Sequence, residues 1–569
     1  MFFILWLRNF NSSPLLAPFG TNLKNSLKKF DRNIWVFLFF ALIILWRLLL
    51  PGYVLTLDMV FGPHFQPFKP AGIDSAHLLN AVLMVLDFFL PMWLVQKIIL
   101  LALFFGLGYL PYRFFPGPKQ ELARVWLGIF YLFNPFVYER FLAGQWMLLA
   151  AYALMPLVLF CANRLVCSPS FASAFFLSLI LYLIANFSPH IFAVSVFVSF
   201  GYFLVFLFKK NRKNGEMLVF FKGFAYLLIF SFIFNFHWLS LSWADKNELL
   251  GSFDNAHFSA FAAAPDPRWG SITNIALLYG FWGENEPWIN NFFLPKDNAI
   301  ILYGSGIFLA VLISTGVCHV VQKEKKRAIL FVSFALISLA LGAGLSDSPF
   351  YFLNNWLYEN LPFYSAFRDS QKWSALLAIS YAFLGASGIS FFLSERRRRW
   401  GTALAYAAFA IPIIYSCAMP GGFGRQLESV WYPAEWKEAD RFLQDKDSSA
   451  KALFLPWHQY LSFVFNRNQV IANPAEQYFS NRIISARQAE IGSAFSRSDD
   501  LHKRLDSLIG EESSNAELVA VLRKNQIFYV ILTKDLRSVD PFKYDFLNSP
   551  QFEKIWEKND LTIYQIVLR

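Results

Sequence analysis

A single carboxylate, Asp58, stands a few residues beyond the first strongly apolar stretch of the chain, in the segment PGYVLTLDMVFGPH that runs from Pro51 to His64. Burial in an apolar setting raises the pKa of a carboxyl group, and such a group is suited to accept a proton from a hydroxyl. Asp58 is therefore a candidate catalytic base. The alternative is an interfacial aspartate that caps a short helix.

Two further polar groups interrupt apolar stretches. Glu139 and Arg140 stand in NPFVYERFLAGQ (134–145), and His190 ends the segment ANFSPH. Ionisable groups at membrane depth are costly and are usually either functional or paired. The structural alternatives are pairing of Glu139 and Arg140 with Arg47 or Asp58, and a simple hydrogen bond for His190.

A fourth group lies in LPFYSAFRDSQK (361–372), directly before a late apolar stretch. Arg368 and Lys372 are expected at the outer headgroup level, where a guanidinium can bind a phosphate with two hydrogen bonds. The alternative for Arg368 is an anchor that reaches to lipid phosphates. The predicted substrate- and phosphate-binding residues are Glu139, Arg140, His190, Arg368 and Asp369.

A divalent metal ion is a possible cofactor. His64, Asp74 and His77 could together hold such a cation, although Asp74 is also a good cap for the amphipathic stretch that runs to Leu90. No CxxC pair and no cluster of histidine and cysteine has the spacing of a zinc site.

The composition decides the class of protein that must position these residues. Of 569 residues, 56% are hydrophobic, 19% aromatic and only 16% charged, with a mean hydropathy of +0.41. Apolar runs approach the ~20 residues that a membrane-spanning helix needs. These values exclude a soluble globular enzyme, a disordered chain, a coiled coil and a porin-like barrel. The chain is expected to be a polytopic α-helical membrane protein.

The net charge of +11 does not indicate binding to nucleic acid. Lys and Arg gather in alternate joins between apolar stretches, which is the bias that places loops on the cytoplasmic side. We predict about eleven spans in the plasma membrane with the N-terminus (1–32) cytoplasmic. The spans are expected at 33–50, 92–111, 122–137, 145–162, 171–187, 191–208, 217–240, 298–320, 328–345, 373–393 and 401–418.

An odd number of spans places the rest of the chain outside. The predicted organisation is a membrane domain (33–419) with outer loops at 51–91, 241–297 and 346–372, followed by an extracytoplasmic α/β domain (420–569). In that domain we expect helices at 433–444 and 515–524, and strands at 451–456, 527–533 and 561–568.

This plan resembles the GT-C superfamily of membrane glycosyltransferases. The NPFVYERFLAGQ and FYSAFRDSQK stretches and the C-terminal domain also resemble a bacterial and archaeal group of membrane proteins that is usually linked to that superfamily. The resemblance covers residues 33–420 in topology. It implies that Asp58 corresponds to the essential acid of the first outer loop, although Met59 stands where many relatives carry a second acid.

The resemblance also implies a function. We expect transfer of a sugar from a polyprenyl-phosphate-linked donor to an extracytoplasmic glycan or glycolipid, with residues such as Trp457, His458 and Tyr460 available to bind the acceptor. A transporter or flippase of a lipid-linked glycan is one alternative, and would place charges in mid-span. A non-catalytic scaffold for envelope assembly is another.

Overall fold

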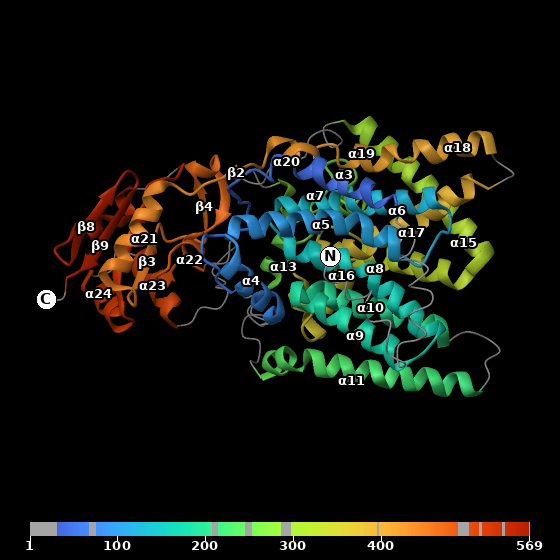
Figure 1. Cartoon of the computed structure of the whole chain (residues 1–569), viewed down its shortest axis with the longest axis horizontal. Helices are drawn as coiled ribbons and strands as arrows, with labels where there is room; N and C mark the ends of the chain where they lie inside the picture. Colours follow the sequence, from blue (N-terminus) through green and yellow to red (C-terminus); the bar gives the residue numbers. More distant parts are fainter. Residues whose placement is uncertain are drawn as a thin grey trace.

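The computed structural model describes residues 31–67, 75–207, 214–244, 253–285, 298–394, 398–487, 500–510, 515–537 and 541–567. Within these ranges a bundle of helices occupies one end of the molecule and a small sheet with its own helices occupies the other (Figure 1). Residues 1–30 and Asp74 lie outside the described residues.

The helical part takes up most of the chain. Its α-helices are α3 (Ile34–Leu45), α4 (His77–Phe89), α5 (Met92–Phe114), α6 (Glu121–Leu132), α7 (Pro135–Leu142), α8 (Trp146–Cys167), α9 (Phe171–Phe187), α10 (Pro189–Leu207), α11 (Asn214–Ala244), α13 (Asn255–Ala260), α14 (Gly270–Ala276), α15 (Ala299–Gly342), α16 (Tyr351–Asn360), α17 (Ser374–Phe392), α18 (Arg398–Ala407), α19 (Ala410–Tyr415) and α20 (Pro420–Arg425). Short 3-10 turns lie at η4 (Trp282–Asn285), η5 (Tyr364–Phe367) and η6 (Ser370–Trp373).

Several of these helices are long and apolar enough to cross a membrane. Six meet both conditions among the described residues, at Met92–Phe114, Trp146–Cys167, Met217–Ser240, Ala299–Gly342, Ser370–Phe392 and Arg399–Arg425. Shorter apolar helices lie at Ile34–Leu45, His77–Phe89, Phe171–Phe187 and Pro189–Val205. The expected count of eleven spans is thus not reached by length and apolarity alone.

Three of the five uncounted spans correspond to the shorter apolar helices Ile34–Leu45, Phe171–Phe187 and Pro189–Val205, and two local features account for the other two. The expected span 122–137 is divided at Asn134, whose side chain accepts a hydrogen bond from Val137 N at 3.1 Å and so begins α7. The expected spans 298–320 and 328–345 both lie within α15, which consists of two helices joined at a kinked break where Glu324 leaves the helical conformation, so they count as one long helix. That kink lies within the basic run Lys323–Arg327.

The C-terminal part is built on a five-stranded mixed sheet of order β6-β3-β7-β9-β8. The parallel strands are β3 (Lys451–Leu455), β6 (Ile483–Ile484) and β7 (Ile527–Thr533), and β8 (Phe552–Lys558) and β9 (Leu561–Ile566) continue the sheet in antiparallel pairing. The helices of this part are α21 (Ala434–Asp447), α22 (Ala475–Tyr478), α23 (Asp500–Gly510) and α24 (Asn515–Lys524).

Both faces of this sheet are covered. On β3, Leu453 and Leu455 belong to one apolar core with residues of α23 and α24, whereas Ala452 and Phe454 belong to the other core with Trp436 of α21. Successive strand residues point to opposite faces, so a strand buried on both sides must be apolar throughout. This explains why the strands are recognisable as unbroken apolar runs.

The two parts meet at the segment after α3 that the sequence predicts to be the first outer loop (51–91). β1 (Tyr53–Val54) pairs antiparallel with β2 (Ser429–Val430), and the hairpin formed by β4 (Tyr460–Phe463) and β5 (Gln469–Ala472) packs beside the residues that follow β1. Tyr432 Oη donates a hydrogen bond to Phe61 O at 2.9 Å. Backbone pairing at several points therefore fixes the C-terminal part against this loop.

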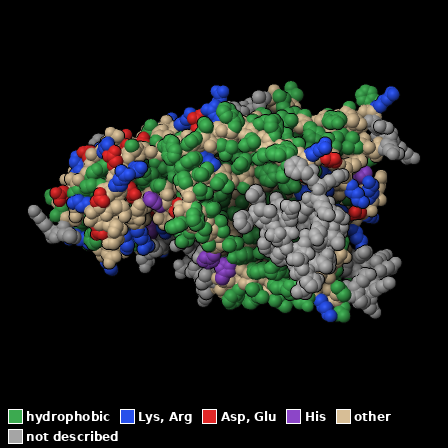
Figure 2. All heavy atoms as spheres, in the orientation of Figure 1, with side chains coloured by type: hydrophobic (Ala, Val, Ile, Leu, Met, Phe, Trp, Pro, Cys, Tyr) green, Lys and Arg blue, Asp and Glu red, His purple; other side chains and the backbone are tan. Residues whose placement is uncertain are grey.

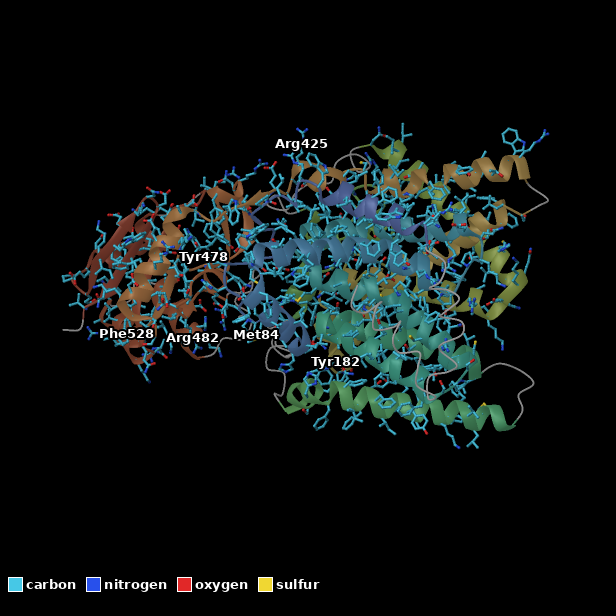
Figure 3. The ribbon with its side chains drawn as sticks, viewed as in Figure 1. Met84, Tyr182, Arg425, Tyr478, Arg482 and Phe528 are labelled. Atoms are coloured by element: carbon cyan, nitrogen blue, oxygen red, sulfur yellow. The ribbon has the colours of Figure 1, made fainter. Side chains whose placement is uncertain are left out.

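The surfaces of the two parts differ in character. In Figure 2, hydrophobic side chains dominate the part of the helical surface that is not drawn in grey, whereas charged side chains gather over the sheet part. Phe88 of α4 is 85% exposed and Phe232 of α11 is 61% exposed. Figure 3 shows the side chains of both parts, with Met84 and Tyr182 from the helical part and Arg482 and Phe528 from the sheet part. Such apolar exposure is what a lipid-facing surface requires.

The basic kink of α15 and the C-terminal part provide a test of orientation. In a cysteine-free background, a cysteine at the exposed Glu553 of β8 should react with a membrane-impermeant thiol reagent in intact cells. The matched cysteine at exposed Lys325 should react only after lysis, because Lys- and Arg-rich loops stay cytoplasmic. The reverse labelling pattern would contradict the expected orientation.

Candidate functional site

Asp58 lies in a tight turn that rests on the junction of α7 and α8. Asp58 N–H donates to Ala143 O at 3.2 Å, and Met59 N–H donates to Thr56 O at 2.7 Å. Gly144 has a φ of +75°, and a Cβ there would collide with the backbone of Thr56 and Met59. Only glycine allows the first outer loop to approach this junction so closely. The turn is not a helix start, so Asp58 is not a helix cap.

The Asp58 carboxyl group combines accessibility with close protein surroundings. Its surface is accessible to solvent, yet burial raises the pKa of the carboxyl, and hydrogen bonds from Tyr460 and Gln145 oppose that rise. The carboxyl group is therefore reachable from solvent although protein atoms surround it. Tyr460 Oη donates to Asp58 Oδ1 at 2.8 Å from the C-terminal part.

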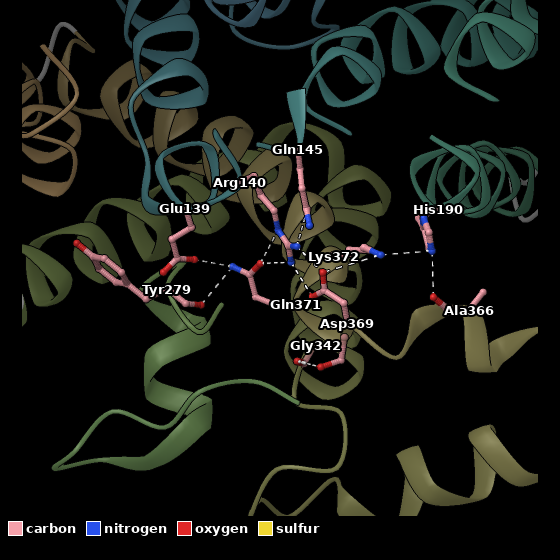
Figure 4. A network of polar contacts seen from close by, with 11 residues as sticks. Glu139, Arg140, Gln145, His190, Tyr279, Gly342, Ala366, Asp369, Gln371 and Lys372 are labelled. Carbon is pink, nitrogen blue, oxygen red and sulfur yellow. Dashed lines mark hydrogen bonds and ion pairs between the residues drawn. The ribbon is translucent and has the colours of Figure 1, made fainter. Parts of the chain in front are cut away.

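Arg140 and Asp369 form the buried centre of the polar network (Figure 4). The Arg140 guanidinium is fully buried and donates through both terminal nitrogens to the Asp369 carboxylate, with Nη2 at 2.9 Å from Oδ1. Arg140 Nη1 also donates to Gln145 Oε1 at 2.8 Å, and Nε donates to Gln371 Oε1 at 3.0 Å. Gln145 therefore connects this ion pair to Asp58.

The charge of Arg140 governs the protonation of its partner. Burial alone would raise the pKa of the Asp369 carboxyl, but the charges of Arg140 and Lys372 outweigh it and hold that pKa below its usual value. The Phe281 ring covers the guanidinium, with its centroid 4.9 Å from Arg140 Cζ. Asp369 is therefore ionised at neutral pH and is occupied in pairing.

Lys372 and His190 lie on the other side of Asp369. Lys372 Nζ is 3.9 Å from Asp369 Oδ2 and 3.4 Å from His190 Nε2, which is itself 2.9 Å from Ala366 O. A neutral imidazole nitrogen either donates to the carbonyl or accepts from the ammonium, depending on the tautomer. The electrostatic environment of Lys372 also includes Arg140, Arg368 and Asp58.

Arg368 contacts aromatic rings of the second outer loop. Its Cζ lies 4.4 Å from the ring centroid of Phe253 and 4.5 Å from that of Phe261. These cation–π contacts fix the plane of the guanidinium. Arg368 also acts on the charge of Lys372, so both cations belong to one cluster. The rings that hold Arg368 come from a different loop.

Glu139 is buried beside Arg140 but has other neighbours. Gln371 Nε2 donates to Glu139 Oε2 at 3.1 Å, and the same nitrogen is 3.5 Å from Tyr279 O. The structural alternative paired Glu139 and Arg140 with Arg47 or Asp58, but Arg140 pairs with Asp369, and Arg47 pairs with Glu428 at 2.6 Å.

The metal candidates are not brought together. His64 Nε2 lies 3.1 Å from Ser480 Oγ and 3.9 Å from Asp440 Oδ2, and the His77 ring lies 4.9 Å from that of His237. Asp74 is outside the described residues. Within the part of the chain that the structure describes, no three His, Cys, Asp or Glu side chains could hold a metal ion. The described residues therefore do not fit a metal centre.

The sequence did not predict the roles of Gln145 and Gln371, whose side-chain amides connect the charged groups of the site. Gln145 and Gln371 carry no charge, and the only signal was a polar residue within an otherwise apolar junction. Trp457, considered for acceptor binding, is buried in the sheet part, where Nε1 donates to Asp506 Oδ1 at 2.6 Å. Its neighbour His458 is exposed.

Comparison with known proteins identifies the fold. No protein-family model and no curated protein sequence matches the chain. Among solved structures, arabinofuranosyltransferase AftD from Mycobacteria superposes with a TM-score of 0.61 at 12% identity, over 95% of this chain and 40% of that protein. This chain has the GT-C fold.

Two further solved structures match the chain, one of them with a much lower TM-score. The archaeal oligosaccharyltransferase AglB from Archaeoglobus fulgidus matches with a TM-score of 0.40 at 10% identity, over 88% of this chain and 65% of that protein. The R1389S mutant of AftD matches with a TM-score of 0.60 at 14% identity, over 94% of this chain and 42% of that one. This chain therefore spans less than half the length of AftD.

The buried ion pair predicts a large stability effect. Asp369→Asn leaves the Arg140 guanidinium without its counter-charge, which should cost about 3–5 kcal/mol in the free energy of unfolding. The matched change Glu324→Gln removes the partner of Arg327 in a pair whose glutamate is 54% exposed, and should cost at most about 1 kcal/mol. Thermal unfolding of the purified variants in detergent measures both.

The same pair predicts a pH dependence. The pKa of the Asp369 carboxyl is lowered in the folded protein, so its stabilising contribution is present above the pKa of the unfolded chain and is lost as pH falls through the folded value. The stability difference between wild type and Asp369→Asn should therefore shrink in strongly acidic buffer. A difference that is constant with pH would show that the pair is not ionic.

Proposed function

We propose that this protein is a membrane glycosyltransferase that moves a sugar from a polyprenyl-phosphate-linked donor to an extracytoplasmic glycan or glycolipid. The observation that carries the proposal is the accessible carboxylate of Asp58, connected through Gln145 to a buried cluster of cations. The GT-C fold, shared with a protein named as an arabinofuranosyltransferase, supports the same reaction class.

In the proposed reaction, Asp58 acts as the base. Its carboxylate accepts the proton of the acceptor hydroxyl as the hydroxyl oxygen forms a bond to the anomeric carbon. The bond from that carbon to the phosphate oxygen breaks, and the electron pair leaves with the polyprenyl phosphate. The raised pKa of Asp58 makes it a better proton acceptor than an ordinary exposed aspartate.

The charge that develops on the leaving phosphate needs cations. The charged side chains that act on Lys372 include the cations Arg140 and Arg368 and the carboxylates Asp369 and Asp58. Arg140 donates to Asp369 through both terminal nitrogens and is fully buried, so the less buried Arg368 and Lys372 are the proposed phosphate contacts. Such preorganised charges act where new charge forms in the transition state.

The remaining predicted residues have supporting roles in this scheme. Arg140 and Asp369 hold Gln145 and Lys372 in place. His190 fixes the position of Lys372 from α10, and Glu139 orients Gln371. None of these contacts requires the residue to touch the substrate.

The proposal includes the arrangement in the membrane. We propose eleven spans within residues 33–419, a cytoplasmic N-terminal segment (1–32) and an extracytoplasmic C-terminal domain (420–569) in the plasma membrane. The alternation of basic joins supports this orientation. It places Asp58, Arg368 and Lys372 at the outer face, next to both lipid and water.

The base is tested by Asp58→Asn, which keeps the shape of the side chain and removes its ability to accept a proton. Release of polyprenyl phosphate from sugar-labelled donors by the purified protein in nanodiscs should fall by about 10²–10⁴-fold. The protein should remain folded, because the turn is held by backbone hydrogen bonds. Near-normal turnover would assign the base to another carboxylate, and movement of labelled lipid across the bilayer without release would indicate a flippase.

The phosphate contact is tested at Arg368. Arg368→Lys keeps the charge but loses the planar stacking on Phe253 and Phe261, so it should retain part of the activity, whereas Arg368→Ala should lose nearly all of it. The rate is measured per folded molecule, with Arg47→Ala as a control at the pair with Glu428. If Arg368 only anchors the loop, the two Arg368 variants will differ in protein yield and have equal turnover.

A further inference from the structure

The hairpin of β4 and β5 is fixed to the turn that carries Asp58. Ala472 N–H donates to Leu57 O at 2.8 Å, and Leu57 pairs with Ile471 in a parallel bridge. A small apolar cluster beneath the turn joins both parts of the molecule. Its members are Leu57, Ala143 and Phe281, with Trp282, Tyr460 and Val470 packed against them.

Tyr460 is therefore held from two sides. Its ring packs against the apolar cluster, and its hydroxyl donates to Asp58 Oδ1 at 2.8 Å. The backbone of the same residue is fixed by pairing with Ala472 across the hairpin. A side chain constrained in this way sets the orientation of the group that it contacts.

We propose that Tyr460 is a positioning residue for Asp58, so that the C-terminal part completes the active site by holding Oδ1 and thereby fixing the orientation of the carboxylate that receives the acceptor proton. The structural contact does not depend on the reaction. Its catalytic consequence rests on the proposed function, in which Asp58 removes the acceptor proton.

The contact has a defined electrostatic effect. Burial and the negative charge of Asp369 disfavour the carboxylate form of Asp58, whereas Lys372, Gln145 and Tyr460 favour it. A phenol that donates to a carboxylate stabilises the charged form. Removing the phenol hydroxyl should therefore raise the pKa of Asp58 and leave a larger share of the enzyme without its base at a given pH.

The direct test does not need a substrate. Full-length protein in detergent is treated with a water-soluble carbodiimide and glycine ethyl ester over a range of pH, and modification of Asp58 is quantified by peptide mass spectrometry. Carbodiimides react with protonated carboxyl groups, so the midpoint of labelling reports protonation, whereas its plateau reports access. In Tyr460→Phe, which keeps the ring, the midpoint should move to higher pH.

Tyr432→Phe is the matched control. It removes a tyrosine hydroxyl that also links the C-terminal part to the first outer loop, but through Phe61 O rather than Asp58. Its labelling midpoint should equal that of the wild type. An unchanged midpoint in Tyr460→Phe would overturn the proposal, and so would an equal shift in both variants, because general loosening of the interface would then explain it.

Activity provides the second readout, with polyprenyl-phosphate donors carrying labelled arabinofuranose, mannose or glucose. In Tyr460→Phe, kcat/KM should fall about ten- to a hundredfold, as expected for a lost hydrogen bond to a charged group, and the acidic limb of its pH profile should move to higher pH. If the wild type transfers no sugar from any donor, the proposed function fails, while the labelling midpoint still decides the role of Tyr460.

Discussion

The buried pair of Arg140 and Asp369 is the interaction on which the rest of the site depends. A fully buried guanidinium is tolerated only when its charge and its donors are matched, and here Asp369, Gln371 and Gln145 supply the acceptors. The pair joins α7 to the segment before α17, which lies 229 positions away. Any relative movement of these two segments would leave a charge uncompensated in an apolar interior. The side-chain amides of Gln145 and Gln371, which accept hydrogen bonds from Arg140, are therefore held in place as well.

The second constraint is the close approach of the predicted first outer loop to the α7–α8 junction on one side and to the C-terminal part on the other. Gly144 brings the turn of Asp58 onto the α7–α8 junction, and Gly62 allows the same loop to approach the C-terminal part, where a Cβ would collide with the backbone of Gln477. The loop is thus fixed between both parts of the molecule. A site fixed in this way needs little reorganisation when charge develops within it.

The sequence was informative where a local pattern has only one physical outcome. The apolar run Ile527–Thr533 is a strand buried on both faces, and Asn515–Lys524 is a helix over the bounds expected from its cap. Glu139, Arg140, His190 and Asp369 are in one region because charges and imidazoles rarely survive in apolar stretches without partners. Which partner each has could not be predicted, since the pairing of Arg140 with Asp369 rather than Asp58 depends on how distant helices pack. The break of the expected third span at Asn134 was concealed by its apolar neighbours.

The contact between Tyr460 and Asp58 shows why the two parts of the chain have to be considered together. The residues are 402 positions apart, so no local signal connects them, yet the carboxylate is subject to opposing influences that nearly all come from the helical part. Burial there favours the neutral acid, while the cations that would stabilise a leaving phosphate favour the carboxylate. In the proposed mechanism these influences follow from the phosphate site and are not adjusted independently. A hydrogen bond from a separate part of the protein would adjust the proposed base alone, because it touches Asp58 without altering the cation cluster. The proposal thus gives the C-terminal part a chemical role that holding an acceptor would not by itself require.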